Sequence, residues 1–132
     1  MTAAHRRAPQ TQQRSPDQLL KSIIAEISTQ KLVFLIFSGK NCHACQQLYA
    51  NLPWLKQRYG DRVYTVVVDV GRHHALAMSY GIMGIPTLFV FHDNQVLFKE
   101  SGLQSKRELK TMVQNAESLV NPAKTSRWRL FG

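Results

Sequence analysis

Two cysteines three positions apart, Cys42 and Cys45, are the residues whose types and spacing best suit chemistry. Small secreted domains that depend on disulfides usually carry four, six or eight cysteines, whereas this chain of 132 residues has two. A disulfide between them closes a very short loop, so it restricts the unfolded chain very little. The pair therefore predicts redox chemistry instead of a structural cross-link.

The position of the pair predicts a different role for each sulfur. Cys42 follows the apolar run Leu32–Phe37 and a short polar loop, so we expect it at the start of a helix. The free N–H groups and the dipole of a helix N-terminus favour a thiolate there. Cys42 is then expected to attack a partner disulfide, and Cys45, one turn later, to displace the captured partner.

A metal site is the main alternative for a Cys-x-x-Cys pair. It would combine the two cysteines with His73 and His74 around zinc. Adjacent histidines rarely point to one centre, and the usual spacing of three to five residues between histidine ligands is absent. We therefore expect neither a metal nor an organic cofactor, and we expect His73 and His74 on the surface.

The hydrophobic pattern predicts an alternation of helices and strands. Helices are expected at 16–29, 42–59, 73–80 and 105–119, and strands at 31–37, 63–70, 87–92 and 96–100. The first two strands are apolar enough to be buried on both faces. The alternation predicts parallel strands joined by right-handed crossovers, and the last two strands are close enough to form an antiparallel hairpin.

Local signals predict where three of the helices begin or are disturbed. Ser15 followed by Pro16 is typical of a helix start, and Ser105 with Glu108 matches a capping box. Pro53 lies inside the expected helix at 42–59. We therefore expect this helix to be kinked or split in two.

The segment YGIMGIPTLFVF, which contains Pro86, closely resembles the signature of the thioredoxin family. In that family a cis proline precedes a central strand and lies beside the reactive cysteines. The segment GLQSKRELKTMV, from Gly102, resembles the family's entry to the last helix, and Asp69 resembles the aspartate that ends its second core strand. The resemblance covers roughly residues 17–118.

This resemblance implies a thioredoxin-like three-layer α/β/α fold, with a central mixed sheet, a C-terminal antiparallel hairpin and flanking helices. It also implies a cis Ile85–Pro86 bond, which leaves the backbone of Ile85 free to pair with an extended substrate. The residues expected to form the substrate groove are His43, Met83, Gly84, Ile85, Pro86 and Gly102. Met83 has the alternative of being an ordinary loop methionine.

The residues around the cysteines depart from the family pattern. Asn41 stands before Cys42 in place of tryptophan, and His43-Ala44 replace Gly-Pro. A protonated His43 beside the thiolate would favour the reduced form and make the disulfide more oxidising. An exposed histidine with little effect is the alternative, so the direction of electron flow stays open.

A second departure concerns proton transfer. The family's buried aspartate, thought to help deprotonate the resolving cysteine, corresponds to Ile36, and its lysine partner corresponds to Thr65. Isoleucine cannot take a proton. Resolution by Cys45 is therefore expected to be slower, or to use water or the substrate.

The net charge of +9 lies mostly in the two ends of the chain. We expect a disordered basic tail at 1–15, a domain at 16–120 and a basic, aromatic tail at 121–132. Between positions 16 and 120 there are eleven basic and eight acidic residues. The tails could bind an acidic partner, nucleic acid or anionic lipid, or could simply be solvated.

No run of 18 apolar residues and no secretory signal is present in this sequence, so we expect a cytoplasmic location. A periplasmic location stays open if a signal has been removed. The expected function is that of a monomeric protein-disulfide oxidoreductase, with protein thiols or disulfides as substrates and an unidentified electron donor or acceptor. The alternative is a binding or accessory module that holds a partner without redox turnover.

Overall fold

The computed structural model describes residues 15–121, and the two predicted tails lie almost entirely outside this range. Its helices are α2 (Pro16–Ser28), α3 (His43–Tyr59), α4 (His74–Ser79) and α5 (Lys106–Val120), with a 3-10 turn η1 (Gly60–Arg62). Its strands are β1 (Leu32–Ser38), β2 (Val63–Asp69), β3 (Thr87–His92) and β4 (Gln95–Ser101). None of these helices is long and apolar enough to cross a membrane.

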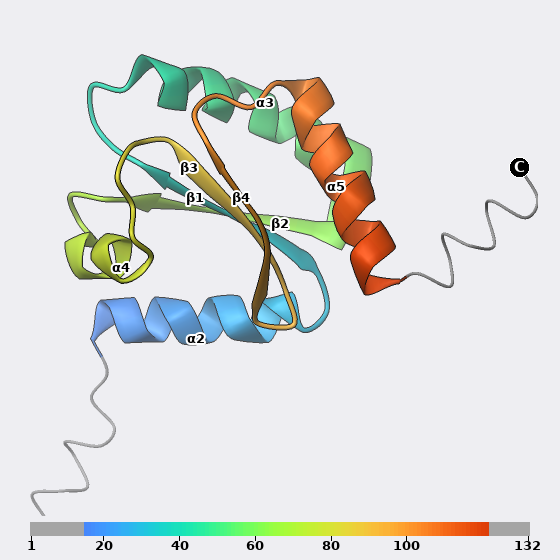
Figure 1. Cartoon of the computed structure of the whole chain (residues 1–132), viewed down its shortest axis with the longest axis horizontal. Helices are drawn as coiled ribbons and strands as arrows, with labels where there is room; N and C mark the ends of the chain where they lie inside the picture. The colour runs from blue at the N-terminus through green and yellow to red at the C-terminus, as the bar shows by residue number, and fades with distance from the viewer. Residues whose placement is uncertain (1–14, 122–132) are drawn as a thin grey trace, which may run out of the picture.

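The strands form one mixed sheet in the order β2-β1-β3-β4 (Figure 1). β1 pairs with β2 in parallel and with β3 antiparallel, and β3 and β4 form the expected antiparallel hairpin. The thioredoxin-like architecture implied by the resemblance is confirmed, since helices flank both faces of this sheet.

The direction of β3 corrects the expectation of parallel strands joined by crossovers. Ser38 lies opposite Asp69 where β1 and β2 end. β3 begins at this same end of the strands, because Thr87 lies opposite Phe37. The connection contains one helix, α4, of six residues, which is about 9 Å long. A strand of seven residues is about 23 Å long, so α4 is too short to carry the chain back to the other end of the strands, where a parallel strand would have to begin.

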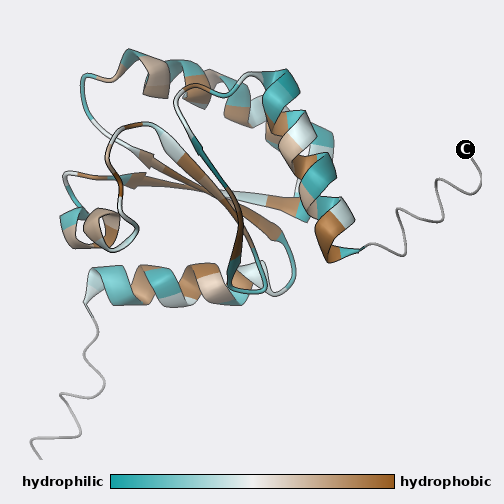
Figure 2. Cartoon of the chain, viewed as in Figure 1, coloured by the Kyte–Doolittle hydropathy of each residue, from teal (hydrophilic) through white to brown (hydrophobic). Residues whose placement is uncertain are grey.

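The central strand β1 is buried along its whole length, as its continuous apolar run predicted. Alternate side chains of β1 enter two separate cores. The ribbon of the central strands is coloured mostly hydrophobic (Figure 2). The side chains that pack with α3 and α5 are Leu32, Phe34 and Ile36, and those that pack with α2 and α4 are Val33, Leu35 and Phe37. β1 therefore holds the helix that carries the cysteines against the rest of the fold.

The prediction that the strand at 63–70 is buried was wrong. β2 is an edge strand, and Tyr64 and Val67 expose 43% and 46% of their surface. A run of valines is equally compatible with a central strand and an exposed edge, because the order of strands in the sheet depends on contacts between distant segments.

The predicted helix starts are confirmed. Ser15 and Ser105 both accept hydrogen bonds from backbone N–H groups three residues later, and both form complete capping boxes. Pro53 does not split its helix, since α3 runs unbroken from His43 to Tyr59. The missing N–H of Pro53 removes one helical hydrogen bond, and the burial of Leu48 and Leu55 against the sheet keeps the helix continuous.

Candidate functional site

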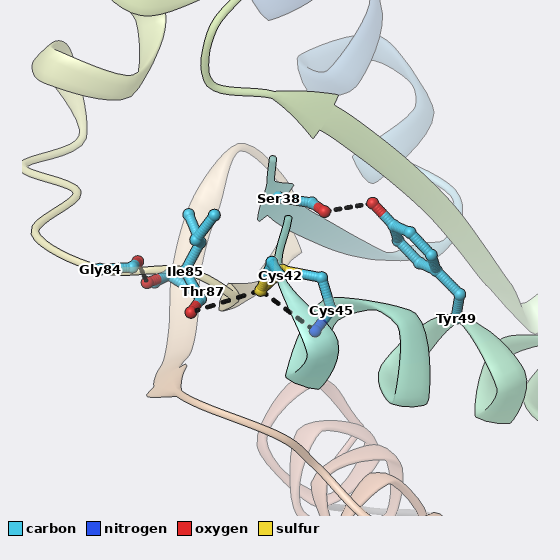
Figure 3. Close-up of a disulfide and its surroundings, with 7 residues drawn as sticks. All are labelled: Ser38, Cys42, Cys45, Tyr49, Gly84, Ile85 and Thr87. Carbon is cyan, nitrogen blue, oxygen red and sulfur yellow. Dashed lines mark hydrogen bonds between the residues drawn. A yellow bond between two sulfur atoms is a disulfide. The ribbon is translucent and has the colours of Figure 1, made fainter. Parts of the chain in front are cut away.

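The two cysteines lie at the N-terminus of α3, as predicted, and are joined by a disulfide (Figure 3). Cys42 is the N-cap residue, and its sulfur accepts a hydrogen bond from the backbone N–H of Cys45 at 3.2 Å. Their Cα atoms are 5.2 Å apart. Cys42 is partly exposed, whereas Cys45 is 1% exposed. One sulfur can therefore be reached by a partner while the other is shielded behind it.

The loop between β1 and α3 brings Cys42 to this position. Asn41 has a φ of +54°, a left-handed conformation that asparagine tolerates better than most residues. Cys42 then returns to an extended conformation, with a φ of −121°, so that its side chain can cap the helix. The asparagine that replaces the family's tryptophan thus fits the turn into α3.

A second segment, 84–87, lies beside the cysteines at the end of the sheet where β1 finishes and β3 begins. The Ile85–Pro86 bond is cis, which confirms the prediction from the family signature. The carbonyl oxygen of Ile85 lies 3.8 Å from the sulfur of Cys42 (Figure 3). The hydroxyl of Thr87 donates to the carbonyl of Gly84 at 2.6 Å and closes this turn.

Two glycines allow this segment to lie close to its neighbours. A Cβ atom on Gly39 would lie 2.9 Å from the terminal carbon of Ile85, so the absence of a side chain leaves room for Ile85. Gly102 has a φ of +87°, and its N–H donates to the carbonyl of Pro86 at 2.8 Å. The predicted neighbours Pro86 and Gly102 are therefore joined directly.

A shallow groove of about 250 Å³ runs from this segment along α4. Its lining is mostly apolar and consists of Val70, His74, Ala77, Met78, Ile82, Met83, Gly84 and Ile85. Three of the predicted groove residues, Met83, Gly84 and Ile85, are among them, and Met83 is 100% exposed. The other predicted residues, His43, Pro86 and Gly102, do not line this groove. His43 is the first residue of α3, and Gly102, which directly follows β4, donates to the carbonyl of Pro86.

Ser38 and Tyr49 form a hydrogen bond near the disulfide that was not predicted from the sequence (Figure 3). Ser38 is the buried last residue of β1, and Tyr49 lies one turn beyond Cys45 on α3. The available signal was a serine at the end of an apolar strand, which needs a partner when buried. Ile36 is fully buried in the core that packs against α3, so its position offers no proton acceptor.

His73 keeps part of its side chain exposed, which agrees with the predicted surface position, but it has a partner that was not predicted. His73 is partly buried, and its Nδ1 lies 2.7 Å from a carboxylate oxygen of Asp17. His74 is exposed, as predicted. Within residues 15–121, no three side chains of His, Cys, Asp or Glu gather in a way that could hold a metal ion, so the zinc arrangement is not seen.

Tyr80 begins the segment that leads from α4 to the cis bond. Its ring packs against Phe37 and Phe89, with centroids 5.4 and 5.3 Å away. Burial raises the pKa of the Tyr80 phenol further above physiological pH, at which the group is already neutral. The aromatic contacts fix the start of this segment without adding a charge near the site.

Known proteins resemble this chain in sequence and fold. The thioredoxin family model matches residues 13–115. A thioredoxin of Bacillus subtilis (strain 168) is 33% identical over 93 residues, which cover 70% of this chain and 88% of that protein. Thioredoxin 2 of Plasmodium falciparum (isolate 3D7) is 24% identical over 83 residues, and the chain spans 53% of its length.

A solved structure of thioredoxin-2, described as a component of the malaria parasite protein secretion machinery, has a similar fold. Its TM-score is 0.62 at 24% identity, and the match covers 64% of this chain and 82% of that one. The family model spans most of the region that carries the cysteines, the cis proline and the capped last helix. The chain belongs to the thioredoxin family.

Proposed function

We propose that this chain is a protein thiol–disulfide oxidoreductase in which Cys42 is the nucleophile and Cys45 the resolving cysteine. One observation carries the proposal: Cys42 and Cys45 form a disulfide at the N-terminus of α3, and Cys42 is partly exposed whereas Cys45 is buried. An accessible sulfur can exchange with a partner, whereas a buried one can react only with its neighbour.

In the reducing direction, the thiolate of Cys42 attacks one sulfur of a substrate disulfide. The bond between the substrate sulfurs breaks, a mixed disulfide forms, and one substrate thiolate leaves. The thiolate of Cys45 then attacks the sulfur of Cys42, which releases the second substrate thiolate and leaves the Cys42–Cys45 disulfide. Two electrons have passed to the substrate, and an external thiol or partner protein must return them.

The surroundings of Cys42 support this role. The N–H of Cys45 points at the sulfur of Cys42, and the positive end of a 17-residue helix lies beside it. Both favour a negative charge on that sulfur. The carbonyl of Ile85, 3.8 Å away, belongs to the segment that we expect to pair with an extended substrate.

Insulin reduction by dithiothreitol tests the proposal. The full chain should accelerate the reaction, and Cys42→Ser should abolish the acceleration. Incubated with insulin in the absence of dithiothreitol, the reduced Cys45→Ala variant should accumulate a mixed disulfide that reducing agent then releases. A chain that binds its partner equally well with and without Cys42, and never accelerates reduction, would be a binding module instead.

The direction of electron flow depends on the redox potential of the pair. His43 is the first residue of α3 and is exposed beside Cys42. When protonated it would stabilise the thiolate, so we propose a potential above the ~ −270 mV typical of a reducing thioredoxin. Equilibration with glutathione measures it, and His43→Ala should lower it. A wild-type potential near −270 mV that is unchanged in the variant would contradict an oxidising role.

A further inference from the structure

The outer edge of β2 is exposed in a way that proteins usually avoid. β2 pairs with β1 on one side, and no other strand of residues 15–121 pairs with its second side. Its sequence, VYTVVVD, contains no Lys, Arg, Pro or Gly, and its one charged residue is Asp69 at the end. An unpaired edge with so few charges is a template for pairing with another strand.

The opposite edge of the same sheet is protected. β4 carries Lys99 and Glu100, and its pairing with β3 shifts register next to Val90. Charged side chains and bulges are the usual means of preventing edge-to-edge association. Because one edge has these features and the other lacks them, the β2 edge is suited to a partner strand.

The backbone of β2 determines which groups face outward. The N–H of Val70 donates to the carbonyl of Ser38 in β1 at 2.8 Å, so it points inward. Successive residues of a strand alternate in direction, so Val66 also points inward, whereas the N–H and C=O of Thr65 and Val67 point away from β1.

This alternation fits a second copy of the same strand. In an antiparallel pair centred on Val66, Thr65 lies opposite Val67 of the second copy, and the two residues can exchange both backbone hydrogen bonds. The two copies are related by a twofold axis through Val66, so Val67 and Thr65 of the second copy make the same pair of bonds, which gives four hydrogen bonds. An isologous contact of this kind closes on itself and yields a dimer, not a fibre.

The side chains are compatible with the same register. Tyr64, which is 43% exposed, would lie opposite the buried Val68 of the second copy, so this register places no charge beside either residue. Asp69 would lie opposite Val63 and not opposite another acid, so pairing brings no like charges together.

Further apolar surface lies beside this edge. Leu19 and Ile23 are exposed on α2, and successive residues of a helix are about 100° apart. They lie opposite Lys21 and Ala25, which line a groove with Phe91 of β3. Since β2 and β3 flank β1 on opposite sides, Leu19 and Ile23 lie on the flank of α2 that faces β2.

We propose that two copies of this chain associate through their β2 edges, in antiparallel register about Val66, to form one continuous sheet. The proposal uses none of the residues assigned to redox chemistry, so its failure would leave the proposed function untouched. It replaces the expectation of a monomer.

The mass of the full chain in solution tests the proposal. Sedimentation over a wide concentration range should give twice the 15.1 kDa chain mass as concentration rises. Val67→Lys should raise the dimer dissociation constant at least ~10-fold, because it puts a charge on the edge. The matched control is Val96→Lys on β4, where valine is 49% exposed and the dimer should be unaffected. Unchanged circular dichroism and redox activity would show that both variants fold.

Amide hydrogen exchange identifies what covers the edge. In the dimer, the N–H groups of Thr65 and Val67 should be protected only at high concentration, and Val67→Lys should remove that protection. A chain that stays monomeric with both amides exchanging freely would overturn the proposal. So would a monomer in which they are protected at every concentration, because the chain's own terminal segments would then cover the edge.

Discussion

The carboxylate of Asp17, in the first turn of α2, accepts a hydrogen bond from the backbone N–H of Leu76 in α4 at 3.0 Å. The other oxygen of the same carboxylate lies 2.7 Å from Nδ1 of His73. One helix therefore supplies the N-terminal cap of another that is 59 residues away in sequence. This contact anchors the short helix that precedes the Ile82–Ile85 wall of the groove.

Replacing Asp17 by alanine should lower the free energy of unfolding by about 1–2 kcal/mol, because the N–H of Leu76 loses its acceptor. Asp17→Asn keeps an oxygen that can accept this bond and should lose less. Guanidinium unfolding monitored by circular dichroism measures both. Asp61→Ala, at an exposed site in η1, is the control and should change stability by less than about 0.5 kcal/mol. Equal losses at Asp17 and Asp61 would contradict the capping role.

Tyr49→Phe should cost about 1–2 kcal/mol, because it leaves the buried hydroxyl of Ser38 without its partner. The double variant Ser38→Ala, Tyr49→Phe removes both polar groups and should be more stable than the sum of the single effects predicts. The exposed Tyr64 offers a matched control, since Tyr64→Phe should be nearly neutral. Strictly additive effects in the double-mutant cycle would show that the two hydroxyls do not interact.

Gly102→Ala should destabilise the chain by about 1–2 kcal/mol, because alanine is strained at a φ of +87°. It should also slow disulfide reduction at least ~3-fold, because Gly102 donates to the carbonyl of Pro86 beside Cys42.

Gly60→Ala is the matched control for this strain, with a φ of +56° at the far end of α3. It should also lower stability but leave the rate of insulin reduction unchanged. The position of Gly102 at the site would have no significance if both variants slowed the reaction equally.

The capping box of α5 makes a contribution to stability that depends on pH. Hydrogen bonds from the backbone N–H and the side chain of Ser105 lower the pKa of Glu108. Because the pKa is lower in the folded chain, the ionised form favours folding. This contribution is complete above the unfolded pKa of about 4.3 and is lost as the pH falls through the folded value.

An NMR titration of the Glu108 carboxylate tests this link. Ser105→Ala should raise the pKa of Glu108 toward its unfolded value, whereas Ser105→Thr keeps the hydroxyl and should leave it low. If Ser105→Ala did not move the titration, the hydroxyl of Ser105 would not contribute to the shift, and the backbone N–H of residue 105 would be its cause.

Features that depend on a few neighbouring residues could be predicted from the sequence. Ser15 and Ser105 cap their helices because a serine oxygen reaches an N–H only three residues away. The helix start at Cys42 follows from an apolar strand and a short polar loop. The cis bond before Pro86 was accessible only through the resemblance to the thioredoxin family, since local sequence does not distinguish it from an ordinary trans proline.

The tertiary structure alone decided how distant segments meet. Residues 63–70 have a composition typical of a buried strand, yet they form the edge of the sheet. The hydrogen bonds from Leu76 to Asp17 and between Ser38 and Tyr49 join different elements, and no spacing in the sequence predicts them. Caps and turns satisfy backbone N–H and C=O groups that lie within a few residues of one another. Strand order and the contacts between helices depend instead on which arrangement buries the most apolar surface of the whole chain.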